Sequence, residues 1–548
     1  MNEMQPLKRW ALGTALCLTL THSALGINSA YADSAPLQQA LAQQLITADV
    51  QHLPIAEFYQ LHDGQPIWQA VLTVESLVAA LNSLESDGLA PVDYHAGTLL
   101  NEFHRSQTSG VSAQAAFDIK ATQSLLLALD HVERGKVDPR DVEPHWDAPR
   151  PERGYSLLRV VHAIEDNKLE DAIALARPSS AEYQQLRDAL KQHYQLANLS
   201  STPYLAAREE SLRPGDETAD VVVLRQRLAL WGDTDLLAAD SSAYPLIGVQ
   251  GTATNRRIFD ASLETAVRRF QRRHLLQADG VVGEQTRLAL NTSVATRIDQ
   301  LRVNLERARW IRPMQFAEPR VWVDIAGYKM HYVRPNGQQW DARVVVGSSR
   351  RETPIIHSAI SHLTINPSWT IPPTIMREDV LPRVRADVDY LARQNIQVIS
   401  PAGVPLIAEE IDWQRPGGVM LRQVAGAGNP LGRVVVRFPN NDMIYLHDTP
   451  ARGLFQRDQR ALSSGCIRVE GVAELAQMLL QDTGSRYQMS SLLSGGSDRN
   501  VNLAQRIPVA LHYLTAWPNE QGEVEFRPDI YRRDATLLAA LQRALPSS

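Results

Sequence analysis

The sequence predicts a multidomain α+β protein with a helical N-terminal scaffold, a small three-helix unit and a mostly β domain that carries a helical, lid-like insertion. At 548 residues the chain is longer than single cores usually grow, so several domains are expected. Apolar residues recur every three or four positions up to about residue 318 and alternate with polar ones from Val321 onward. The net charge is −6 and no basic stripe is present, which argues against a nucleic-acid partner.

The N-terminus carries the pattern of an export signal. Lys8 and Arg9 precede the apolar run WALGTALCLTL, and residues 30–32 (Ala-Tyr-Ala) supply the small residues of a signal-peptidase site. The apolar run is shorter than the ~20 residues that span a bilayer, which disfavours an uncleaved inner-membrane anchor. We therefore predict a signal peptide at 1–32 and an exported mature chain that begins at Asp33.

Residues 33–210 are predicted to form the helical scaffold domain. Stretches such as AALNSLESDGLAP and KATQSLLLALDHVERGKVDP place apolar residues three and four positions apart, as packed helices require. The Pro-rich segment PHWDAPRPERG interrupts the series, as a loop would. His131 and His145 lie here, and lone histidines of this kind indicate structural or solvated positions rather than metal ligands.

Residues 211–291 have the pattern of a compact bundle of about three helices. Leu263, Val267 and Phe270 share one helical face. Three features, in this order, resemble the peptidoglycan-binding domain found in many cell-wall enzymes: Phe270-Gln271, the DGVVG turn at 279–283 and Thr286. An ordinary small helical domain is the alternative, because DG turns and helical periodicity are common.

The remaining chain is predicted to be a connecting helix followed by the mostly β domain. A helix is expected within 292–318, where four apolar residues share one face: Ile298, Leu301, Leu305 and Ala308. From 319 to 505, β-branched residues alternate between Gly, Asn and Pro turns. Helical spacing returns at about 374–420 and predicts an insertion packed over the sheet as a lid. Residues 506–548 are predicted to form a C-terminal extension that adds a late strand.

Cys466 would be the only thiol of the mature chain, because Cys17 lies in the predicted signal peptide. A lone cysteine in an oxidising compartment is either a buried small hydrophobe or a reactive group. His447 follows the apolar run MIYL, as a side chain projecting from a strand would, and is a candidate base. Gly465 lets the backbone approach a substrate, so the amides of Gly465 and Cys466 are candidate oxyanion donors. The helix predicted after Cys466 would modestly favour a thiolate.

The same residues resemble the active-site signature of the L,D-transpeptidases with a YkuD-type domain, which remodel bacterial peptidoglycan. The resemblance rests on YLHDTP at 445–450 and SSGCIRV at 463–469, and on the Asn-Pro-x-Trp segment that begins INPSW at 365. Many members have histidine and asparagine where this chain has Ser464 and Arg468. That departure fits the large Gram-negative branch of the family. Together with the predicted export signal, this resemblance implies a periplasmic location.

The resemblance implies an acyl transfer that needs no metal or organic cofactor. His447 deprotonates Cys466, which attacks the third-residue carbonyl of a tetrapeptide stem, releases D-alanine and forms a thioester. A diaminopimelate amine of an acceptor stem then opens the thioester and makes a 3-3 cross-link. The resemblance also implies that carbapenems label Cys466. The sequence indicates no oligomeric state.

Several neighbours of the two central residues have open roles. Asp448 either orients His447 through its carbonyl or caps a turn through its carboxylate. Arg468 either steadies the loop, binds a substrate carboxylate or forms an intramolecular ion pair. Four further residues are candidate substrate contacts, with core packing or loop hydrogen bonding as the alternative: Tyr445, Trp369, Ser463 and Ser464.

Two other functions are compatible with the sequence. A cysteine peptidase, acting as an L,D-carboxypeptidase on stem peptides, would use the same Cys and His with water as acceptor. A non-catalytic cell-wall-binding scaffold would bury Cys466 as a hydrophobe. A zinc peptidase is disfavoured because neither His-x-His nor His-Glu-x-x-His occurs.

Overall fold

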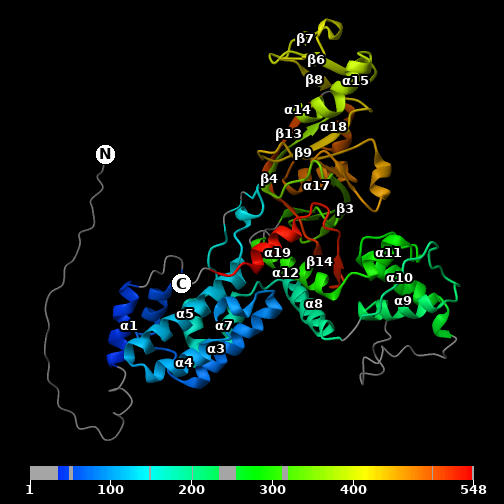
Figure 1. The fold of residues 1–548 in the computed structure, drawn as a ribbon. Coiled ribbons are helices and arrows are strands. Elements are labelled where there is room, and N and C mark those ends of the chain that lie inside the picture. The colour runs from blue at the N-terminus through cyan, green and yellow to red at the C-terminus, as the bar shows by residue number, and fades with distance from the viewer. Residues whose placement is uncertain are drawn as a thin grey trace, which may run out of the picture.

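The computed structural model describes residues 35–47, 53–146, 148, 150–199, 202–233, 255–311, 319–496 and 498–545. The predicted signal peptide at 1–32 lies outside these residues. Figure 1 shows a helical N-terminal domain in blue and cyan, a small helical unit in green, and a β domain whose yellow-green insertion projects at its far end.

The N-terminal domain is a helical bundle around one long helix, α5 (Val111–Arg134). Gly110 and Gly135 flank this helix at φ 91° and 92°, values that favour glycine. Asp118 of α5 is buried and accepts a hydrogen bond from the Tyr59 hydroxyl at 2.7 Å. The other helices are α1 (Ala35–Thr47), α2 (Ile55–Leu61), α3 (Val71–Ser83), η1 (Leu84–Asp87), η2 (Pro91–Tyr94), α4 (Leu99–Thr108), η3 (Pro139–Asp141), α6 (Leu157–Glu165), α7 (Leu169–Ala176) and α8 (Ala181–Ala197).

The small helical unit confirms the predicted apolar face. Leu263, Val267 and Phe270 are all buried. Gln271 explains the turn motif, because its side chain donates to Asp279 Oδ1 at 2.9 Å and its Oε1 accepts the Gly280 N–H at 2.9 Å. The elements are α9 (Ala219–Leu230), η5 (Asn255–Arg257), α10 (Ala261–Arg273) and α11 (Glu284–Leu290).

The connecting helix α12 (Val294–Trp310) is buried on its polar side as well as its apolar face. All four predicted face residues are buried, and so are Asn304, Glu306 and Arg309. Arg309 contacts the Glu306 carboxylate at 2.6 Å and the Tyr183 hydroxyl at 2.9 Å. The helix thus packs against elements of other domains on several sides, which its periodicity does not reveal.

The β domain is built on a nine-stranded sheet in the order β11-β3-β12-β10-β9-β4-β13-β1-β2, and an additional β2–β3 pairing closes it into a barrel. Buried Val, Ile and Leu side chains fill the interior. Helices α17 (Val472–Asp482) and α18 (Met489–Ser494) follow β12. The strands are β1 (Arg320–Asp324), β2 (Lys329–Val333), β3 (Gln339–Gly347), β4 (Ile356–Ile365), β9 (Val434–Arg437), β10 (Leu446–His447), β11 (Ala461–Ser463), β12 (Ile467–Val469) and β13 (Arg499–His512).

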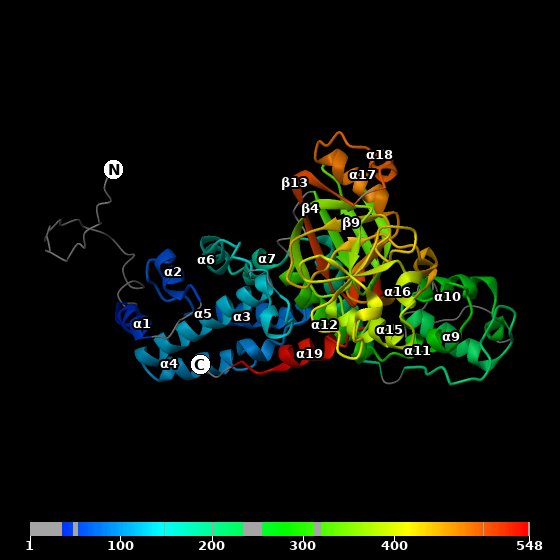
Figure 2. The same cartoon turned by 90° about the horizontal axis from the view of Figure 1, so that it is seen from above.

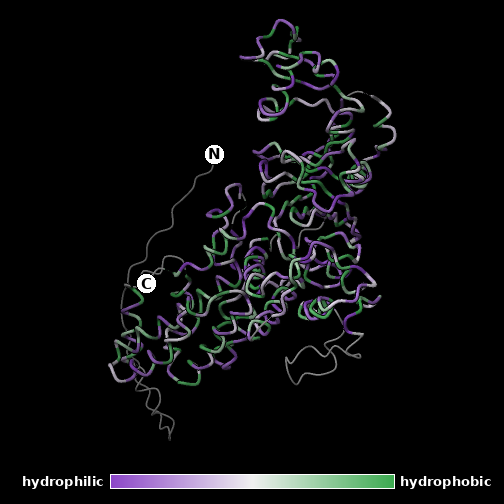
Figure 3. The backbone as a smooth tube through the Cα atoms, turned by 45° about the vertical axis from the view of Figure 1, so that its right-hand side comes forward, coloured by the Kyte–Doolittle hydropathy of each residue, from purple (hydrophilic) through white to green (hydrophobic). Residues whose placement is uncertain are grey.

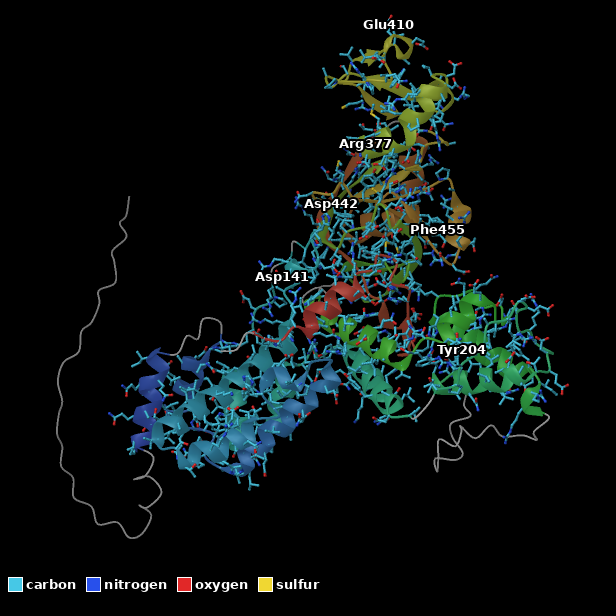
Figure 4. All side chains as sticks on the ribbon, in the orientation of Figure 1. Asp141, Tyr204, Arg377, Glu410, Asp442 and Phe455 are labelled. Atoms are coloured by element: carbon cyan, nitrogen blue, oxygen red, sulfur yellow. The ribbon has the colours of Figure 1, made fainter. Side chains whose placement is uncertain are left out.

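The insertion contains a small sheet in addition to the helices that the sequence predicts. Its four strands are ordered β5-β8-β6-β7, and its own core includes Val384, Leu391 and Leu421. Figure 4 shows Glu410 at its tip and Arg377 near its junction with the barrel. The elements are β5 (Trp369–Thr370), α14 (Pro373–Ile375), η6 (Met376–Val380), α15 (Leu381–Ala386), α16 (Tyr390–Arg393), β6 (Ile396–Ile399), β7 (Pro405–Leu406), η7 (Ala408–Glu410) and β8 (Met420–Gln423).

The C-terminal residues join the domains. Strand β13 runs through residue 505, where the sequence predicts the catalytic domain to end, and pairs with β4 and β1 up to His512. The hairpin of β14 (Ala516–Pro518) and β15 (Val524–Phe526) packs against α8 and α10. Helix α19 (Asp534–Gln542) lies beside α12 (Figure 2), and Arg307 contacts the Asp534 carboxylate at 2.6 Å.

Hydrophobic residues are dispersed through every described domain (Figure 3). None of the helices in the described ranges combines the length and the apolar character that a bilayer-crossing segment needs. Within the same residues, no three His, Cys, Asp or Glu side chains gather as a metal-binding group.

Candidate active site around Cys466 and His447

Strand register places the central residues on one face of the barrel. Strands β10 and β12 are parallel with Leu446 opposite Ile467 and His447 opposite Arg468, and the Ile467 N–H donates to the Tyr445 carbonyl at 3.1 Å. Leu446 and Ile467 point into the core and are fully buried. Because successive strand residues alternate between faces, their neighbours share the other face. The structure therefore brings Cys466 and His447 together with Tyr445 and Arg468.

The Cys466 thiol is partly exposed, and its environment disfavours the thiolate. Its Sγ lies 3.6 Å from the Met443 carbonyl oxygen, to which it donates. Burial raises the pKa of the thiol, while contacts with Tyr445 and the charges of Arg437 and Arg468 act in the opposite direction. The expected thiolate-favouring effect of a following helix is wrong here, because β12 intervenes before α17 begins at Val472.

The His447 imidazole is held as a neutral base. Its Nδ1 lies 2.6 Å from the Asp448 carbonyl oxygen, so this nitrogen donates to that oxygen, and the Pro430 carbonyl also contacts the ring. The His447 residue is only 4% exposed. Burial, followed by the charge of Arg468, lowers the pKa of His447 to about 3. The described hydrogen bonds do not join this ring to Cys466, so transfer of the thiol proton requires the two groups to approach.

The backbone carbonyl and the side-chain carboxylate of Asp448 make different contacts. Its carbonyl contacts the His447 ring, whereas its carboxylate accepts the Arg433 N–H at 3.0 Å and the Arg452 guanidinium at 2.9 Å. Of the two predicted contacts, the carbonyl is the one that reaches the imidazole.

The loop before Cys466 is fixed by hydrogen bonds. Gly465 has φ 110°, a left-handed value that favours glycine, and its carbonyl accepts from the Thr353 hydroxyl at 2.7 Å. Its N–H, a predicted oxyanion donor, is 3.2 Å from Ser463 Oγ, which itself donates to the Cys466 carbonyl at 2.5 Å. In this arrangement Ser463 organises the loop, and the Gly465 amide is already engaged.

Arg468 and the two aromatic candidates surround the thiol. The Nε of Arg468 is buried without a hydrogen-bond partner, and no ion pair to Arg468 occurs within the described ranges. Tyr445 interacts with both Cys466 and Trp369, and burial is the main cause that raises the pKa of its hydroxyl. The Arg437 guanidinium lies 4.5 Å from the centre of the Tyr445 ring. These contacts favour pocket-wall positions for Tyr445 and Trp369.

The insertion is linked to the reactive loop by Arg351, which sequence reasoning missed. Its guanidinium donates to Ser464 Oγ at 2.9 Å, to Asp379 at 2.6 Å and to Glu378 at 2.7 Å. Arg437 was also missed. Neither residue carries a local signal, because each becomes part of the site only through contacts between distant segments.

The thiol of Cys466 is expected to alkylate with an apparent pKa above the value of ~8.5 for an ordinary cysteine. The reason is burial, which disfavours the charged thiolate, together with a His447 that stays neutral between pH 5 and 8 because its pKa is about 3. The measurement is the pH dependence of iodoacetamide modification, in a Cys17→Ala chain that retains one thiol. The urea-unfolded chain serves as the control for an ordinary thiol. A midpoint near pH 6 would contradict the prediction, since it would indicate a preformed thiolate–imidazolium pair.

Comparison with known proteins assigns the three regions. Residues 54–190 match a scaffold domain, residues 217–290 match a "Putative peptidoglycan binding domain", and residues 318–489 match an L,D-transpeptidase catalytic domain. A Haemophilus influenzae protein named "Putative L,D-transpeptidase" is 36% identical over 248 residues, which cover 44% of this chain. The match spans about half of that relative, 50% of its length.

These matches coincide with the structural units. The scaffold match lies in the bundle around α5, and the catalytic match contains β1 to β12 with Cys466 and His447. The sequence-based prediction of fold class and domain type is therefore confirmed. The chain carries a YkuD-type L,D-transpeptidase catalytic domain, joined to a scaffold domain and a peptidoglycan-binding domain.

Proposed function

We propose that this chain is a peptidoglycan L,D-transpeptidase in which Cys466 is the nucleophile and His447 the general acid and base. The observation that carries the proposal is the β10–β12 register, which sets both side chains on one face beside Arg468. The match of the surrounding domain to L,D-transpeptidases supports the same reaction class. The donor is a tetrapeptide stem and the acceptor a second stem.

Acylation begins with transfer of the thiol proton to His447 Nε2, which the neutral imidazole can accept. The sulfur then attacks the third-residue carbonyl carbon and a C–S bond forms. The negative charge on the carbonyl oxygen is stabilised by backbone amides, with the Cys466 N–H as one donor and the Gly465 N–H as a second once it leaves Ser463. The C–N bond to D-alanine breaks, and the imidazolium returns the proton to the leaving amine.

Deacylation completes the cross-link. A diaminopimelate amine attacks the thioester carbonyl and gives its proton to His447, the C–S bond breaks, and the sulfur is reprotonated. The product is a 3-3 amide between two stems. Water in place of the amine would give a tripeptide, which is the L,D-carboxypeptidase alternative.

Arg468 supplies a positive charge beside the reacting sulfur. Since its Nε is buried without a hydrogen-bond partner, a carboxylate of the stem or the developing thiolate would satisfy it. Tyr445 and Trp369 are proposed as walls that orient the stem, and Ser463 and Ser464 as the loop that holds Cys466. Export by the N-terminal segment, a periplasmic location and labelling of Cys466 by carbapenems belong to the same proposal.

The test incubates the purified chain with disaccharide tetrapeptides and identifies the products by mass. Dimers that have lost one D-alanine are expected, because an amine is the proposed acceptor. Tripeptide monomers without dimers would favour the L,D-carboxypeptidase. Unchanged tetrapeptides would contradict both enzymatic functions and favour the binding scaffold.

A further inference from the structure

A cleft of about 1420 Å³ lies between the peptidoglycan-binding unit and the barrel. Its lining residues do not include Cys466, His447, Tyr445 or Arg468. Four elements contribute to it: the sheet β1–β2–β3, the β14–β15 hairpin, the start of α8 and helix α10. The cleft is therefore built from parts of the chain that are far apart in sequence, and it is separate from the candidate active site.

The barrel wall of this cleft follows from strand register. One row across β1, β2 and β3 is Trp322, His331 and Asp341, whereas Val321 and Val323 face the buried interior. Because residues two apart share a face, the outward side of this sheet carries polar side chains and one large aromatic ring. Such a surface is suited to a polar ligand rather than to an apolar one.

Two tryptophans form the aromatic part of the cleft. The Trp322 and Trp517 rings lie 6.0 Å apart at an interplanar angle of 32°, and both side chains are partly exposed. Trp322 is supported by the buried ring of His512 at 4.6 Å. A supported, partly exposed indole face is suited to packing against the C–H face of a pyranose ring, since it combines an apolar surface with little conformational freedom.

Charged side chains of both signs surround these rings. Lys329 contacts Glu525 at 3.1 Å, and the hairpin residue Glu523 accepts from Arg269 of α10 at 3.0 Å. Arg272 of α10 is exposed and lines the same cleft. The carboxylates disfavour a polyanion such as nucleic acid, whereas mixed charge suits a sugar chain that carries peptides with both amines and carboxylates.

We propose that this cleft binds a segment of the peptidoglycan glycan strand, with sugar rings on Trp322 and Trp517 and stem-peptide carboxylates near Arg272. The inference rests on the proposed function, because it takes peptidoglycan as the substrate. It adds a composite site at the junction between α10 and the barrel. Binding there holds the strand on the enzyme while a stem reaches Cys466.

The test measures binding of a purified two-disaccharide tetrapeptide fragment by isothermal titration, in the full chain with Cys466→Ala to prevent turnover. Trp322→Ala and, separately, Arg272→Glu are each expected to weaken binding about tenfold. Tyr204→Ala is the matched aromatic control, because Tyr204 (labelled in Figure 4) is 71% exposed and is not among the residues that line the cleft. Arg159→Glu, on an exposed position of α6 in the scaffold domain, is the matched charge control.

The outcomes separate the cleft from the catalytic proposal. If both cleft variants bind the two-disaccharide fragment with wild-type affinity, the proposal that the cleft binds the glycan strand is wrong, even if the enzyme makes dimers. Free tetrapeptide is expected to bind Trp322→Ala and the parent chain equally, and a matching loss with free tetrapeptide would overturn sugar stacking. Failure of wild-type protein to form dimers, with cleft binding intact, overturns the transpeptidase proposal alone. Trp322→Ala with native Cys466 is checked for folding by its iodoacetamide reactivity, which should equal that of the wild-type chain.

Discussion

Cys466→Ala is expected to reduce dimer formation by on the order of 10³-fold or more, because no other group in the proposed mechanism can form the thioester. The thiol is partly exposed, and it makes a long hydrogen bond to the Met443 carbonyl and further contacts with Tyr445. Loss of the sulfur should therefore change the free energy of unfolding by no more than about 1 kcal/mol. Dimers are quantified by mass spectrometry and stability is followed by urea unfolding.

The matched control for this variant is Cys17→Ala, which removes the other cysteine of the chain. It is expected to leave cross-linking unchanged, because Cys17 lies in the predicted signal peptide. Retention of cross-linking by Cys466→Ala would refute the nucleophile assignment and return Cys466 to the role of a packed hydrophobe. A large loss of stability in this variant would also count against a chemical role, since lost activity would then follow from unfolding.

Asp87→Ala is expected to cost about 3 kcal/mol of folding free energy, because it leaves two partly buried guanidinium groups and the buried Tyr183 hydroxyl without their carboxylate. The Asp87 side chain is fully buried and contacts Arg177 at 3.0 Å and Arg187 at 2.7 Å. It also accepts from the Tyr183 hydroxyl at 3.0 Å, and its backbone carbonyl accepts from Arg309 of α12. This network joins the scaffold helices to the connecting helix.

The measurement for Asp87→Ala is the urea midpoint of the full chain, followed by circular dichroism and by activity. Activity and scaffold helicity should be lost at lower urea than in the wild type, since the network links the domains. Asp166→Ala is the matched control: its ion pair with Lys168, at 3.2 Å, lies on the surface with side chains 63% and 61% exposed. The free energy of unfolding of Asp166→Ala should stay within about 0.5 kcal/mol of the wild-type value. A similar urea midpoint for Asp87→Ala and Asp166→Ala would contradict the prediction that the Asp87 network contributes more to the free energy of unfolding than the surface ion pair does.

Local periodicity predicted much of the architecture. The buried face of Leu263, Val267 and Phe270 and the strand character of the β domain both follow from which side chains must leave water. The local motif around Cys466 and His447 predicted the region of the candidate active site, because it records residue types and spacing along the chain. The family match confirmed the domain type, while the roles of individual site residues stay predictions.

Other features depend on partners that are distant in sequence. Helix α12 reads as amphipathic, yet it is buried on its polar side too, because α8, α19 and the scaffold pack around it. Strand β13 continues through residue 505 because β4 and β1 supply its hydrogen bonds. Arg351 and Arg437 join the site through contacts with segments that no local pattern connects to them.

The sequence by itself predicted the order of the domains, the pattern of buried faces and a local motif that contains both His447 and Cys466. Only the tertiary structure decided that burial raises the pKa of the Cys466 thiol, that the Asp448 carbonyl contacts His447 and that Arg468 has no described ion pair. The physical reason is that periodicity and turn chemistry act between neighbours along the chain. Protonation and pairing depend instead on burial and on charges that only folding brings together.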